Sequence, residues 1–169
     1  MDYLYEYRQA NTPPAKPPQS SQSRSQPWLP PPKGLLKLNV DAALDVDNQT
    51  IGVGSIVRNS YGQVIAAILA PIKGVFSVKE IEAKAISYCL KWLHHINCSV
   101  HLIETDALTV SQNVNNPQQY YSYFYDLVRD IIYQMSYFPS ISLRYVYRSV
   151  NSAVHGLARF ALRIDTEIV

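Results

Sequence analysis

The chain has 169 residues, of which 47% are hydrophobic and 17% are charged, and its formal net charge is +2. This length accommodates one domain with its own core, and no uninterrupted apolar run is long enough to span a bilayer. So small a net charge argues against general attraction to nucleic acid, and any such binding needs a local basic patch. The two cysteines, Cys89 and Cys98, form neither a zinc-ligand spacing nor a disulfide framework.

Residues 1–33 differ in composition from the rest of the chain. They contain 8 of the 11 prolines and none of the 6 glycines. Such a segment buries too little apolar surface to offset its ordering entropy, so we expect a disordered, proline-rich tail or linker before a domain at residues 34–169. Trp28 and residues 30–32 are expected to lie against the edge of that domain. The first ten residues do not resemble a signal peptide, and the composition favours an intracellular, reducing compartment.

Three predicted strands open the domain. Alternating apolar and polar residues predict the first strand at residues 35–41. The second is expected at residues 51–58, and the turn-forming residues 59–62 connect it to a third at 63–70, which Pro71 is expected to end. Because the connections are short, these strands are predicted to form an antiparallel meander.

The second half of the domain alternates helices and strands. Ser77 and Glu80 have the spacing of a capping box, which predicts that a helix begins there. The expected elements are, in order, helix 77–95, strand 100–106, helix 107–114, helix 124–135, strand 141–148, and a helix capped by Asn151 or Ser152. The order β-β-β-α-β-α-α-β-α predicts an α/β fold with one five-stranded mixed sheet flanked by helices.

Three carboxylates occupy positions from which they can converge. Asp41 is expected to end the first strand, Asp106 to end the fourth, and Glu82 to lie on the first turns of the first helix. A buried strand-end carboxylate is unfavourable alone and stable beside a cation, and Mg²⁺ prefers oxygen ligands. Two such ions can cleave a phosphodiester. Each residue also has a structural interpretation, as a turn former, a helix cap or an exposed helix residue, but the three together with the element order favour a metal site.

Five motifs, in this order along the chain, resemble the plant ribonuclease H-like domain, which is related to the tail of non-LTR retrotransposon reverse transcriptases. They lie at residues 28–43, 52–58, 82–85, 104–106 and 148–159, and the resemblance covers about residues 28–165. It implies the ribonuclease H fold. It also implies Mg²⁺-dependent endonucleolytic cleavage of the RNA strand of RNA–DNA hybrids, with metal-binding carboxylates at Asp41, Glu82 and Asp106.

One position departs from the pattern of this family. Ribonucleases H usually carry a fourth carboxylate on the last helix, four residues after an asparagine; here that position is His155, as in many of the plant proteins. Imidazole is a poorer ligand than carboxylate for Mg²⁺ and a better one for Mn²⁺. A side chain that titrates near neutral pH can also relay a proton or assist product release. Alternatively, His155 only forms a hydrogen bond near the site.

Two functions stay open at this point. The first is a hybrid-cleaving enzyme, expected to act as a monomer on nucleic acid with two Mg²⁺ ions, or Mn²⁺ in their place, and with His155 in the fourth position. The second is a nucleic-acid-binding module on the same fold that turns over poorly or not at all. A proofreading-type exonuclease is set aside, because its second acid would stand where Ala43 is found. Gly52 and Gly54 are expected to permit close approach of another backbone, including that of a nucleic acid.

Overall fold

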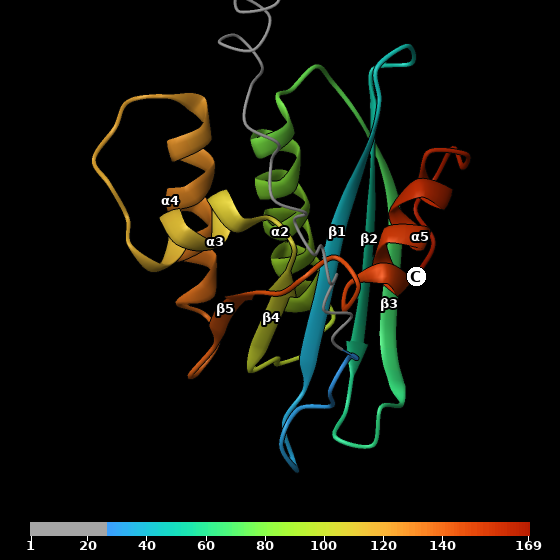
Figure 1. The fold of residues 1–169 in the computed structure, drawn as a ribbon, viewed down its shortest axis with the longest axis vertical. Helices are drawn as coiled ribbons and strands as arrows, with labels where there is room; N and C mark the ends of the chain where they lie inside the picture. The colour runs from blue at the N-terminus through green and yellow to red at the C-terminus, as the bar shows by residue number, and fades with distance from the viewer. Residues whose placement is uncertain (1–26) are drawn as a thin grey trace, which may run out of the picture.

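In the computed structural model, which describes residues 27–169, five strands form one mixed sheet with helices on both faces (Figure 1). Of the predicted tail at residues 1–33, residues 1–26 lie outside the described part of the chain. The strands are β1 (Lys37–Asp45), β2 (Thr50–Arg58), β3 (Val64–Lys73), β4 (Leu102–Thr105) and β5 (Ser142–Tyr145), in the spatial order β3-β2-β1-β4-β5. The first three are antiparallel, and β4 is parallel to both β1 and β5. The predicted element order and α/β architecture are confirmed.

The helices divide between the two faces of the sheet. They are α2 (Val78–His95), α3 (Leu108–Asn115), α4 (Tyr123–Met135) and α5 (Ser152–Ala161). Helix α2 packs on β1 and against α4 and α3, while α5 lies across β1, β2 and β3 on the opposite side (Figure 1). The predicted capping box is present at the start of α2, where the Ser77 backbone N–H donates to Glu80 Oε2 at 2.8 Å. None of the helices described has the length and hydropathy needed to cross a membrane.

Alternation along β1 separates an apolar face from a polar one. Leu38 and Val40 are fully buried in the core that the sheet forms with α2 and α4. Asn39 and Asp41 point to the other face because side chains alternate along a strand, and they are 2% and 3% exposed. The polar residues of β1 are therefore buried on the α5 side, which is where the site described below forms.

Gly52 and Gly54 on β2 allow α5 to approach the sheet. A Cβ at Gly52 would lie 2.0 Å from the Ala158 carbonyl oxygen, and a Cβ at Gly54 would lie 2.4 Å from the Ala158 nitrogen and 2.7 Å from the Val154 carbonyl oxygen. Gly54 pairs with Asp41 across the β1–β2 ladder. The backbone that approaches these glycines is therefore that of α5, and not that of a nucleic acid. This approach places α5 beside Asp41.

Several strand ends differ from those expected, because pairing and not composition sets them. β1 continues to Asp45, since its hairpin with β2 stays paired to Thr50. β3 runs through Pro71 to Lys73, as an edge strand tolerates a proline. β4 is shorter than predicted, and β5 ends at Tyr145, where a turn leads into α5.

Candidate active site

The three predicted carboxylates come from three different elements. Asp41 lies in the middle of β1, and not at its end as expected, because the hairpin extends beyond it. Asp106 directly follows the last residue of β4, and Asn39 pairs with Glu104 in the parallel ladder. The two aspartates, each two residues further along, are thus at corresponding positions of neighbouring strands. Glu82 is the fifth residue of α2, as predicted.

The electrostatics of these carboxylates show an excess of negative charge. The pKa of Glu82 is raised to about 8, mainly by burial and then by the charges of Asp41 and Asp106, against a lowering effect of Arg148. Burial also raises the pKa of Asp41 above its usual value, and the charge of Asp106 adds to this, despite hydrogen bonds from His155 and the Ala42 N–H. Bringing these groups together therefore favours either proton uptake or a bound cation.

The oxygen donors of this set suit a hard divalent cation. Carboxylates are the ligands that Mg²⁺ and Mn²⁺ take in proteins, and a cation beside Asp41 and Glu82 would relieve the repulsion that raises their pKa values. Within residues 27–169, no group of three or more such side chains already surrounds a common metal position. The donor set fits a divalent ion, and the carboxylates would have to draw together around it.

His155 joins this cluster from α5. Its Nδ1 lies 2.7 Å from Asp41 Oδ2, and its Nε2 lies 2.7 Å from Arg148 Nη2. The same Nη2 lies 3.2 Å from Nδ1, so the guanidinium lies beside both ring nitrogens. His155 therefore connects Asp41 on β1 with Arg148 in the turn before α5.

A groove of about 760 Å³ runs past these residues between the end of β1, the start of α2 and α5. Glu82 and His155 line it on one side, and Arg148 and Arg159 add positive charge. Arg148, which was predicted to end the strand at residues 141–148, lies instead in the turn before α5, because β5 ends at Tyr145. This places a guanidinium at the groove beside the carboxylates.

Asn151 is the main residue whose role sequence reasoning missed. It stands at the N-cap of α5, as predicted, but its side chain does not cap the helix. Its Nδ2 donates to the Val40 carbonyl at 2.8 Å and to Asp106 Oδ1 at 3.0 Å. Asp106 does not cap α3 either, because Ala107 stands at that position. The Oδ1 of Asn151 in turn accepts a hydrogen bond from Asn39 Nδ2 at 3.2 Å. The two-residue period of β1 places Asn39 on the same face as Asp41, and that spacing is the signal that sequence reasoning could have used.

A sequence profile described as reverse transcriptase-like matches residues 39–161, which is most of the chain. The chain belongs to the reverse transcriptase-like family. The matched region of this family member begins within β1 and ends with α5, and it contains all four predicted site residues. No curated protein sequence matches the chain significantly.

Solved structures similar to this reverse transcriptase-like domain include several ribonucleases H. RNase H1 from the archaeon Halobacterium salinarum superposes with a TM-score of 0.68 at 17% identity, covering 77% of this chain and 98% of that one. The N-terminal RNase H domain of a Mycobacterium tuberculosis protein gives 0.65 at 17%, covering 76% and 93%. LC11-RNase H1 in complex with an RNA/DNA hybrid gives 0.65 at 13%, covering 76% and 96%. The fold is therefore ribonuclease H-like.

Proposed function

We propose that this domain cleaves the RNA strand of RNA–DNA hybrids endonucleolytically, in a reaction that requires divalent metal ions. The observation that carries the proposal is the proximity of Asp41, Glu82 and Asp106, close enough that their charges, together with burial, raise the pKa values of Asp41 and Glu82; Glu82 also lines the groove. The family supports the same activity class, and one structural neighbour, LC11-RNase H1, was solved with an RNA/DNA hybrid.

In this proposal Asp41, Glu82 and Asp106 hold the metal, which is Mg²⁺ or Mn²⁺. Two such ions, when bound, activate water and stabilise the attacking and leaving oxygens of the phosphodiester. The protein contributes the positions of the ligands. Asp41 is fixed by the Ala42 N–H and His155, and Asp106 by Asn151. These two ligands are thus held in place by neighbouring groups, as efficient catalysis requires.

His155 and Arg148 act in proton transfer and in substrate binding. His155 contacts Asp41 through Nδ1, and the guanidinium of Arg148 lies beside the same ring, 2.7 Å from Nε2. When a substrate phosphate draws Arg148 away, Nε2 becomes free to accept a proton from the reacting groups. We therefore assign His155 a catalytic role as a proton relay at the fourth position.

A nucleic-acid-binding module with little or no turnover is the alternative. Two observations favour it: His155 replaces the usual fourth carboxylate, and within the described residues the carboxylates do not yet surround a metal position. The basic side chains of Arg148 and Arg159 would serve binding alone equally well. Cleavage by the wild-type protein therefore distinguishes the two functions.

The experiment is cleavage of an end-labelled RNA–DNA hybrid by the purified full chain, with Mg²⁺ and Mn²⁺ tested separately. We expect cleavage that Asp41→Asn abolishes while hybrid binding persists. Asp130→Asn, which removes an exposed carboxylate on α4, is the matched control and should cleave normally. His155→Asp should raise activity with Mg²⁺ relative to Mn²⁺. Folded wild-type protein that binds the hybrid but cuts it with neither metal would leave only the binding function.

We also propose that the domain derives from the plant, retrotransposon-related branch of the family. The ordered motifs and the histidine at position 155 support this origin. We expect it to act as a monomer inside the cell, where RNA–DNA hybrids form. Sedimentation of the purified protein tests the first expectation, and localisation of a tagged full-length chain tests the second.

A further inference from the structure

A continuous series of hydrogen bonds links Trp28, before the first strand, to Asp106 in the candidate site. The Trp28 Nε1–H donates to Asn39 Oδ1 at 2.9 Å, Asn39 Nδ2 donates to Asn151 Oδ1 at 3.2 Å, and Asn151 Nδ2 donates to Asp106 Oδ1 at 3.0 Å. Asn39 and Asn151 are 2% and 1% exposed. Water therefore has little access to the two amides that connect the ends of the series.

The direction of these hydrogen bonds is fixed by the groups at each end. An indole N–H only donates, so it requires the oxygen of Asn39, and the amide nitrogen of Asn39 then faces Asn151 and Glu104 Oε2, which lies 3.0 Å away. A carboxylate and a backbone carbonyl only accept, so Asn151 must turn its nitrogen to Asp106 and its oxygen to Asn39. Neither amide can flip without placing like groups together.

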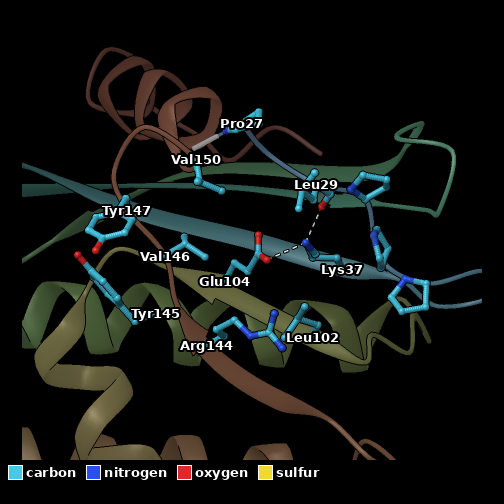
Figure 2. A pocket seen from close by; sticks show the side chains of 13 residues that line it. Pro27, Leu29, Lys37, Leu102, Glu104, Arg144, Tyr145, Val146, Tyr147 and Val150 are labelled. Carbon is cyan, nitrogen blue, oxygen red and sulfur yellow. Dashed lines mark hydrogen bonds and ion pairs between the residues drawn. The ribbon is translucent and has the colours of Figure 1, made fainter. Parts of the chain in front are cut away.

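The segment that carries Trp28 is itself held on the sheet. The Leu29 carbonyl accepts a hydrogen bond from Lys37 Nζ at 2.7 Å, and the same ammonium pairs with Glu104 Oε1 at 2.7 Å (Figure 2). The Trp28 ring lies 5.2 Å from Lys37 Nζ and 4.9 Å from the Arg58 guanidinium carbon. These contacts fix the indole in the orientation that directs its N–H to Asn39.

We propose that Trp28 is a positioning residue, which orients the Asp106 carboxylate through Asn39 and Asn151. This inference rests on the proposed metal-dependent function, in which Asp106 is a metal ligand. Trp28 would hold that carboxylate in its orientation before the metal binds. Trp28 lies within the motif at residues 28–43 but before residues 39–161, the part of the chain that the sequence profile matches. It also lies outside the domain predicted at residues 34–169, so a protein shortened to that boundary would keep every carboxylate and lose the residue that sets the amide series.

The test compares two tryptophan variants by two measurements. Trp28→Phe keeps an aromatic ring and removes the N–H. Trp92→Phe is the matched control, because the buried Trp92 Nε1 has no hydrogen-bond partner in the described residues. The first measurement is NMR of the side-chain amides of Asn39 and Asn151, without metal. The second is Mn²⁺ binding by electron paramagnetic resonance, without substrate, with Asn151→Ala as the reference for direct loss of the Asp106 contact.

Asn151→Ala should weaken Mn²⁺ binding by about tenfold to a hundredfold, the range found when an outer partner of a metal ligand is lost. Trp28→Phe should shift the amide resonances of both asparagines and weaken Mn²⁺ binding less, by about threefold to tenfold, because it acts on Asp106 only through the two amides. Trp92→Phe should leave both readouts unchanged. Unchanged asparagine resonances, or a lower melting temperature with unchanged Mn²⁺ affinity, would overturn the proposal and leave Trp28 a packing residue. Wild-type protein that binds no Mn²⁺ would instead refute the proposed function, while the amide resonances still report on the hydrogen-bond series.

Discussion

Glu82→Gln should stabilise the metal-free protein at pH 8 and have little effect near pH 4.5. The pKa of Glu82 is about 8 in the folded protein against an ordinary value of 4.5. Between these values the unfolded chain has lost the proton that the folded chain keeps, so the folded state binds more protons. The free energy of unfolding therefore falls as the pH rises from 4.5 to 8 and levels off above that. Glutamine does not ionise and escapes this loss.

The size of the effect follows from the same two pKa values. Each pKa unit corresponds to about 1.36 kcal/mol, which gives an upper limit of about 4 kcal/mol at pH 8. Glu82 is only partly buried by its accessible surface, and solvent reduces the effective penalty, so we expect a gain of about 2 kcal/mol for Glu82→Gln at pH 8. Mg²⁺ should stabilise the wild-type protein at that pH and should do so much less in the variant, which lacks one proposed ligand.

The assay is urea denaturation of both proteins from pH 4.5 to 9 in a chelator, followed by repetition with Mg²⁺. Glu80→Gln is the control on the same helix: hydrogen bonds to Ser77 lower the pKa of Glu80, so its neutralisation should bring no gain at pH 8. A difference between wild type and Glu82→Gln that stays constant with pH would refute the reasoning, since it would mean that the carboxyl ionises as readily in the folded protein as in the unfolded chain.

Two further predictions concern packing and charge. Gly54→Ala should lower the free energy of unfolding by about 3 kcal/mol or more, because its Cβ would meet the α5 backbone at 2.4 Å; Gly156→Ala, in open space on the same helix, should raise it by about 0.5–1 kcal/mol. Equal effects in urea denaturation would show that α5 does not need the close approach. Lys37→Met should lower the free energy of unfolding by about 3–5 kcal/mol, because it leaves the buried Glu104 carboxylate without its cation. Adding Glu104→Gln should restore much of this stability, and a double variant no more stable than Lys37→Met would contradict the prediction.

Local patterns in the sequence were sufficient for the order of the elements. The capping box at Ser77 and Glu80, the turn at residues 59–62 and the apolar stripe of α4 depend on neighbours within one or two turns of chain, and each is found where it was predicted. The same applies to the approximate placement of the carboxylates, because a strand, a helix and a second strand in this order bring their ends to one edge of a parallel pair.

Contacts between distant parts of the chain decided the rest. The end of β1 depends on how far β2 stays paired with it, which moved Asp41 from the strand end to its middle. The use of Gly52 and Gly54 depends on α5, more than a hundred residues later. The side chain of Asn151 could equally cap its own helix, and only the positions of the Val40 carbonyl and Asp106 beside it gave it other partners.

By itself, then, the sequence determined which residues form strands and helices and which residue types can hold a cation. Periodicity, capping and turn chemistry act over a few residues and are legible without a structure. The contact of His155 with Asp41, the guanidinium at the groove and the link from Trp28 to Asp106 were decided only by tertiary structure. Each depends on a donor meeting an acceptor across the sheet, and such a meeting is set by the packing of whole elements and not by the spacing of residues along the chain.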